Sequence, residues 1–126
     1  MRSGHKGDVS EIMVLAELLR RNMEVAIPYG NRPGYDLLVV GSKGQWKRIQ
    51  VKTAHQRNGR GGTYVDFIRG SGKGKRRFYT KDDFDVLIAI RHDNGHFWVF
   101  RNKDIIDKRC MAVGIGSREF EAIDYL

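Results

Sequence analysis

Hydrophobic and polar positions first repeat with the period of a helix. Apolar residues recur at helical spacing over residues 8–22, which predicts an amphipathic first helix with one buried stripe. Asp8 is followed three residues later by Glu11, the spacing of a capping box, so the helix is expected to begin at Asp8. The positions expected to be buried are Ile12, Leu15, Ala16 and Leu19.

Further along the chain, apolar and polar residues alternate as in β-strands. Strands are predicted at residues 23–27, 35–40, 45–52, 63–68, 84–91 and 96–100. Residues 42–44 suit the loop of a first hairpin, and the "DNG" at 93–95 suits the turn of a second. A short helix is expected over 102–108, and the pattern from Cys110 onward is ambiguous. These elements predict one domain of mixed α/β class spanning residues 1–126.

Three polar side chains interrupt the strands of the first hairpin. Asp36 stands at the mouth of an apolar run, and Gln50 and Lys52 lie inside the next strand. If the loop pairs Gly41 with Gln45, counting back along both strands sets Asp36 opposite Gln50 on the same face. Lys52 follows on that face. The register therefore predicts that the three side chains converge at one end of the hairpin.

Glu11 is a candidate to join this group. On the predicted helix it lies on the flank of the apolar stripe, whereas Glu17 points to solvent. A helix packed on the sheet could therefore aim Glu11 at the edge of the sheet. The alternative is that Glu11 only completes the capping box.

Two carboxylates, an amide oxygen and an ammonium group suit a specific chemistry. Hard oxygen ligands bind Mg²⁺ or Mn²⁺ and leave coordination positions for water and phosphate. Such a metal neutralises charge on a scissile phosphate and lowers the pKa of an attacking water. Lys52 could position that water or stabilise the pentavalent transition state. Each residue also has a plain structural explanation, and it is their combination that indicates hydrolysis of a phosphodiester.

The distribution of charge indicates a polyanionic partner. The chain has 126 residues and a net charge of +8. Residues 55–77 hold seven basic residues and one acidic residue, Asp66, with glycines that predict two flexible loops around the strand at 63–68. Such loops can wrap a phosphate backbone, although they could also serve only to keep the protein soluble. The basic residues are Arg57, Arg60, Arg69, Lys73, Lys75, Arg76 and Arg77.

Three motifs, in this order and spacing, resemble a known family. "KGDVSE", "YDLLVV" and "RIQVKTA" are similar to the motifs of the PD-(D/E)XK nuclease superfamily, and most similar to those of its group I intron-associated homing endonucleases, which share the "QVK" variant. Archaeal and phage Holliday junction resolvases also begin with a Lys-Gly pair and a helix glutamate, matched here by Lys6, Gly7 and Glu11.

The resemblance implies a fold and a set of roles. It implies a restriction-endonuclease-like core, with an N-terminal helix, a mixed central sheet and a short flanking helix. Glu11, Asp36 and Gln50 would be metal ligands, together with the backbone carbonyl of Val51, and Lys52 would be the catalytic lysine. The chain departs from the family pattern where Tyr35 replaces a proline and Gln50 replaces an acid. The neutral Gln50 leaves a side-chain charge of about −2, which matches one Mg²⁺, and Mn²⁺ is expected to substitute.

These observations favour a metal-dependent DNA endonuclease of the homing, site-specific type. A structure-specific Holliday junction resolvase and a non-catalytic basic DNA-binding module remain as alternatives. Lys6 joins the basic residues of 55–77 as a candidate DNA contact, on a duplex target or a four-way junction. Cleavage of two strands needs two active sites, so a homodimer or homotetramer is expected, with apolar surface from Phe120, Ile123 and Tyr125 in the tail.

Other classes of site are excluded by spacing. "GSGKGKR" is too short for a P-loop and has Arg76 where a hydroxyl should bind Mg²⁺. His92 and His96 flank the "DNG" turn without the partners of a zinc site. No apolar run suits a signal peptide or a membrane span, and Cys110 is the sole cysteine, so the cytosol of a prokaryotic or phage-infected cell is the expected location.

Overall fold

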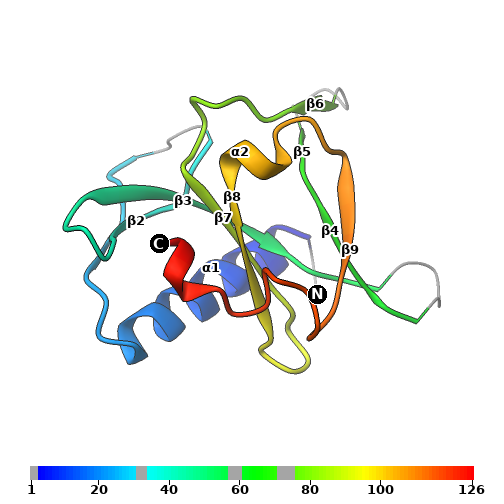
Figure 1. The fold of residues 1–126 in the computed structure, drawn as a ribbon, viewed down its shortest axis with the longest axis horizontal. Coiled ribbons are helices and arrows are strands. Elements are labelled where there is room, and N and C mark those ends of the chain that lie inside the picture. The colour runs from blue at the N-terminus through cyan, green and yellow to red at the C-terminus, as the bar shows by residue number, and fades with distance from the viewer. Residues whose placement is uncertain (1–2, 31–33, 57–60, 71–75) are drawn as a thin grey trace.

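A five-stranded mixed sheet forms the centre of the molecule (Figure 1). The computed structural model describes residues 3–30, 34–56, 61–70 and 76–126. The order of the strands is β1-β2-β3-β7-β8, with β3 and β7 parallel and the other pairs antiparallel. Both predicted hairpins are confirmed. The strands are β1 (Val25–Ala26), β2 (Leu37–Val40), β3 (Trp46–Thr53), β7 (Val86–Ile90) and β8 (Phe97–Arg101).

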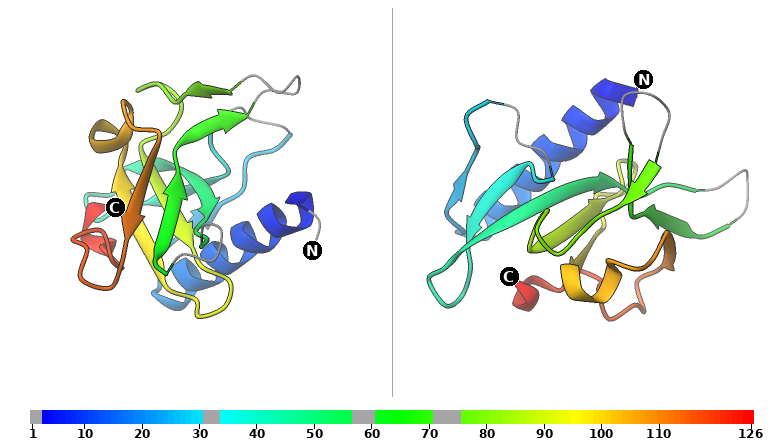
Figure 2. Two further views of the ribbon diagram at one scale, coloured as in Figure 1. Left: turned by 90° about the vertical axis from the view of Figure 1, so that its right-hand side faces the viewer. Right: turned by 90° about the horizontal axis from the view of Figure 1, so that it is seen from above.

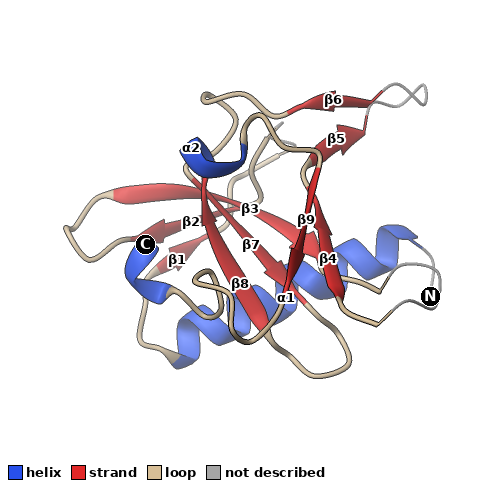
Figure 3. Cartoon of the chain, turned by 45° about the vertical axis from the view of Figure 1, so that its right-hand side comes forward, coloured by secondary structure: helices blue, strands red, loops and turns tan. Residues whose placement is uncertain are grey.

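The two faces of the sheet are covered by different elements (Figure 3). Helix α1 (Ser3–Arg20) packs Val14 and Leu18 on one face. On the other face, β4 (Thr63–Asp66) pairs with β9 (Cys110–Val113), and α2 (Asn102–Ile105) lies beside them. All five residues of β7 are buried, because alternate side chains enter the two cores. The mixed fold predicted from the resemblance is confirmed.

The register of the first hairpin is the predicted one. Leu37 is the partner of Ile49, and the Gly41 N–H donates to the Gln45 carbonyl at 2.8 Å. Gly44 has φ of 76°, the left-handed conformation that a three-residue hairpin loop requires. Continuing this ladder by one residue sets Asp36 beside Gln50.

The boundaries and the buried face of α1 differ from the prediction. The helix begins at Ser3, so Asp8 and Glu11 lie inside it and form no capping box. Its buried face is formed by Ser10, Val14 and Leu18. Apolar residues surround most of this helix, so the sequence pattern fits two faces, and packing on the sheet selects one of them. On the opposite face, Ile12 and Leu19 are 65% and 53% exposed, and Ala16 is also exposed.

Glu17 also departs from the prediction. It does not point freely to solvent, because its side chain is only 24% exposed and its carboxylate forms ion pairs with Arg20 and Arg21.

The predicted strand at 63–68 is divided in two at Phe67. Phe67 is 1% exposed, and its N–H donates to the Arg109 carbonyl at 2.8 Å, after which the chain leaves β9. The second part, β5 (Ile68–Gly70), pairs with β6 (Arg76–Phe78), which the sequence did not predict. Figures 1 and 2 show this β5–β6 ribbon at the periphery of the molecule. Arg69, Arg76 and Arg77 therefore lie in strands, not in loops as expected.

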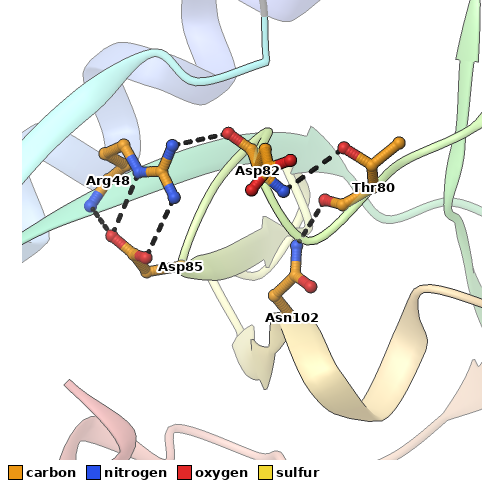
Figure 4. A network of polar contacts seen from close by, with 5 residues as sticks. All are labelled: Arg48, Thr80, Asp82, Asp85 and Asn102. Atoms are coloured by element: carbon orange, nitrogen blue, oxygen red, sulfur yellow. Dashed lines mark hydrogen bonds and ion pairs between the residues drawn. The ribbon is translucent and has the colours of Figure 1, made fainter.

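Ion pairing and hydrogen bonds fix the segment between β6 and β7 against β3 (Figure 4). The backbone N–H of Arg48 donates to Asp85 Oδ2 at 2.8 Å, and its guanidinium contacts both oxygens of that carboxylate. Arg48 also donates to the Asp82 carbonyl, and Asn102 of α2 donates to the Thr80 carbonyl at 3.0 Å. This network anchors residues 80–85 at the start of the parallel β3–β7 pair.

The tail returns to the core. Ile123 and Tyr125, in the short 3-10 helix η1 (Ile123–Tyr125), pack against the core beneath α1, and Phe120 packs against the core on the other face. These three residues, which were expected to form apolar surface for assembly, are half-buried. Among the described residues, α1 and α2 are too short or too polar to cross a membrane.

Candidate active site

The candidate site lies where the start of β2 meets the second half of β3. Asp36 directly precedes β2, and its backbone N–H donates to the Ile49 carbonyl at 2.7 Å. Its carboxylate Oδ2 accepts the N–H of Val51 at 2.9 Å. The antiparallel register thus fixes the Asp36 carboxylate against the backbone of β3.

Glu11 and Asp36 line the same cavity, of about 290 Å³, beside Asp8 and Tyr35. Burial, followed by the charges of Asp36 and Asp8, raises the pKa of Glu11. Burial also raises the pKa of Asp36, and this effect outweighs the hydrogen bond from Val51 and the positive charge of Lys52. Because the Asp36 charge disfavours ionisation of Glu11, a cation between the two carboxylates would stabilise the site.

Gln50 is linked to Asp36 through the backbone of Val51, whereas Lys52 acts on Asp36 through its charge. The Gln50 Nε2 donates to the Val51 carbonyl at 3.0 Å, while the N–H of the same residue is bound to Asp36. The Lys52 Nζ donates to the Ile68 carbonyl at 3.3 Å and lies 5.4 Å from the centre of the Tyr79 ring. Its charge acts on Asp36, since it lowers the pKa of that carboxyl.

The oxygen atoms of this site are suitable ligands for one hard divalent cation. The structure brings together two carboxylates, an amide and a backbone carbonyl, which is the oxygen-rich set that Mg²⁺ accepts. Within the described residues, no three histidine, cysteine, aspartate or glutamate side chains cluster as a metal site, and the present set has only two such residues. The Gln50 amide nitrogen donates to the Val51 carbonyl. The amide must therefore rotate by half a turn before the Gln50 Oε1 and the Val51 carbonyl oxygen can bind the same ion.

A second group of polar residues joins the helix to the sheet. The buried Ser10 Oγ lies 2.6 Å from Thr53 Oγ1 and 2.7 Å from His92 Nε2. Ser10 precedes Glu11, and Thr53 follows Lys52, so these contacts connect the two sides of the site. Sequence reasoning missed this group, because a serine within an apolar helix face gives no signal of its partners.

The structure describes only part of the predicted DNA-binding set. Arg77 is exposed on β6, where it is the cross-strand partner of Arg69, and Lys6 is exposed on α1. Strand β6 also contains Arg76. The other predicted contacts lie outside the described residues. They are Arg57, Arg60, Lys73 and Lys75.

Comparison with known proteins identifies the family. A sequence profile described as PD-(D/E)XK endonuclease matches residues 1–118. The chain belongs to the PD-(D/E)XK endonuclease family. No curated protein matches the sequence of this endonuclease.

Two solved structures are similar to this endonuclease. A bacterial homing endonuclease, I-Ssp6803I, has a TM-score of 0.81 and 25% identity, over 97% of this chain and 90% of that chain. MepB has a TM-score of 0.52 and 12% identity, over 90% of this chain and 87% of that chain, and this likeness shows the fold alone. The family and the first structure agree with the resemblance seen in the sequence motifs.

Proposed function

We propose that this endonuclease is a Mg²⁺-dependent enzyme that hydrolyses DNA phosphodiester bonds at specific sites. The observation that carries the proposal is the pairing of Glu11 and Asp36 in one cavity, with Asp36 bound to the Val51 peptide between Gln50 and Lys52. The similarity to a bacterial homing endonuclease supports the site-specific type. The nuclease domain is proposed to extend over residues 1–126.

Each residue has a defined task in this proposal. Glu11, Asp36, Gln50 and the Val51 carbonyl would hold Mg²⁺, and Mn²⁺ is expected to substitute. When bound, the metal neutralises charge at the scissile phosphate and lowers the pKa of the attacking water. Lys52 places a positive charge beside Asp36, where it stabilises negative charge that develops on the phosphoryl oxygens. Lys6 and the arginines and lysines of residues 57–77 bind the phosphate backbone.

The enzyme is proposed to act as a homodimer or homotetramer, because cleavage of two strands needs symmetry-related sites. The exposed apolar side chains Ile12 and Leu19 of α1 are proposed to contribute to the interface, because they are more exposed than the half-buried apolar side chains of the tail. Light scattering should return at least twice the chain mass of 14.5 kDa. The chain mass alone, with and without DNA, would contradict the assembly.

Cleavage of two substrates in Mg²⁺ tests the proposed function. A site-specific enzyme should cut linear duplex that carries its target and should cut a four-way junction of unrelated sequence much more slowly. A search for the target can use a randomised duplex library, with cut ends identified by sequencing. Cleavage of every junction, with no preferred duplex sequence, would replace this proposal with a junction resolvase. DNA binding without cleavage of either substrate would indicate a binding module.

A further inference from the structure

The ammonium of Lys52 is held at the base of the β5–β6 ribbon. Its Nζ donates to the carbonyl of Ile68, the first residue of β5, at 3.3 Å. It also lies 5.4 Å from the ring centre of Tyr79, which follows the last residue of β6. Ile68 and Phe78 are cross-strand partners, so both contacts come from the same end of the ribbon.

The Tyr79 ring is itself firmly placed. It is 6% exposed and packs edge-on against Phe84, with ring centres 5.0 Å apart. The next residue, Thr80, accepts a hydrogen bond from Asn102 and donates its N–H to Asp83 at 2.7 Å. The network around Arg48 fixes the same segment to β3, the strand that contains Lys52 (Figure 4).

The fixed position of the Tyr79 ring restricts the motion of the Lys52 side chain. A lysine side chain has four flexible bonds and many rotamers, so an unconstrained ammonium would seldom occupy one position. The face of an aromatic ring attracts a cation, most strongly where water is excluded, and a backbone carbonyl adds direction. Together they restrict the ammonium to the neighbourhood of Asp36.

We propose that Tyr79 is a positioning residue, which with the Ile68 carbonyl holds the Lys52 ammonium in place for cleavage. The inference rests on the proposed role of Lys52 in hydrolysis. Tyr79 does not contact DNA or metal in this account. Its effect on the rate therefore passes entirely through Lys52 and leaves DNA affinity unchanged.

The test compares Tyr79→Leu, which removes the ring, with Tyr79→Phe, which keeps it. Tyr79→Leu should lower kcat about tenfold with KM and DNA affinity unchanged, whereas Tyr79→Phe should stay within about twofold of the wild type. In Lys52→Met, adding Tyr79→Leu should have no further effect, because the group it positions is gone. By NMR of the metal-free protein, the ring current of Tyr79 should shift the Lys52 side-chain protons in the wild type and in Tyr79→Phe, but not in Tyr79→Leu.

Phe100→Leu is the matched control for lost aromatic packing. Phe100 packs edge-on against Phe67 in the same core, with ring centres 5.1 Å apart, and lies in β8, which β7 separates from the strand of Lys52. It should reduce thermal stability but not kcat. Equal losses of kcat in Phe100→Leu and Tyr79→Leu, wild-type kcat in Tyr79→Leu, or equal losses in Tyr79→Phe and Tyr79→Leu would each overturn the inference. A fully active Lys52→Met would instead overturn the proposed role of Lys52.

Discussion

At the residue scale, the backbone N–H and carbonyl of Val51 organise the candidate site. Its N–H binds the Asp36 carboxylate, and its carbonyl accepts from Gln50. Because both groups belong to the rigid backbone of a strand, these two hydrogen bonds restrict the side chains of Asp36 and Gln50 to defined positions. Burial raises the pKa of both Asp36 and Glu11, so ionisation of these carboxyls costs more here than in water, and a bound cation would offset that cost.

Changes at Gln50 test the ligand set. Gln50→Glu keeps the shape of the side chain and adds a charge, so Mg²⁺ should bind about tenfold more tightly and the preference between Mg²⁺ and Mn²⁺ should shift. Gln50→Ala should weaken metal binding. Calorimetric titration of both variants with each metal provides the measurement. Affinities equal to those of the wild type in both variants would make Gln50 a structural residue.

The convergence of Asp36, Gln50 and Lys52 could be predicted because a three-residue loop fixes the hairpin register, and register fixes which residues are opposite. The approach of Glu11 could be predicted only as a possibility, since its position depends on how α1 packs. The contacts of Lys52 with Ile68 and Tyr79 could not be predicted. They depend on β6, which follows a glycine-rich segment without strand periodicity.

At the element scale, polar contacts outside the hydrophobic cores determine how helices and strands meet. Ser10, Thr53 and His92 join α1 to the end of β3, and Arg48 joins the start of β3 to the segment before β7. The hydrophobic periodicity predicted that α1 exists but did not predict which of its faces is buried, because apolar residues occur around most of the helix. The buried face is determined by the sheet on which α1 packs, where Thr53 and His92 form hydrogen bonds with the Ser10 hydroxyl.

The Arg48–Asp85 pair makes folding stability depend on pH in a defined direction. Burial tends to raise the pKa of Asp85, but the hydrogen bonds and charge of Arg48 outweigh it and lower the pKa. A lowered pKa means that the ionised group stabilises the fold above the ordinary aspartate pKa of about 3.9, and that this contribution is lost as the pH falls through the lowered value.

Asp85→Asn should therefore destabilise the protein by about 1 kcal/mol at neutral pH, a modest effect because the pair is partly exposed. The difference from the wild type should shrink below about pH 4. Urea unfolding of both proteins between pH 3 and pH 7 would measure this difference in the free energy of unfolding. A constant difference across that range would show that the carboxylate charge is not what joins these elements.

At the scale of the whole molecule, the β5–β6 ribbon lies at the periphery while its base contacts the candidate site. The ribbon contains Arg69 and Arg77, and the Ile68 carbonyl at its base accepts from Lys52. The charge and glycine content of this region were evident from the sequence, but its two strands were not. The same element is thus proposed to bind phosphates at one end and to position the ammonium at the other.

Salt dependence tests the role of the ribbon in binding. If Arg77 contacts one phosphate, Arg77→Ala should reduce the slope of log affinity against log salt by about 0.9 and weaken binding to all sequences alike. Its thermal stability should not change, since the side chain is exposed. Lys43→Ala, at the exposed loop between β2 and β3, is the control and should leave the slope unaltered. A wild-type slope in Arg77→Ala would remove Arg77 from the proposed interface.

The most direct test of the central claim is a Mg²⁺ titration of single-turnover DNA cleavage by the wild type and Asp36→Asn. Asparagine keeps an acceptor for the Val51 N–H but removes the charge that the metal needs. The wild type should be inactive in EDTA and should reach a plateau as Mg²⁺ rises. Asp36→Asn should bind DNA equally well and cleave at least about a hundredfold more slowly at the same Mg²⁺. Wild-type rates in Asp36→Asn, or cleavage by the wild type in EDTA, would contradict the account.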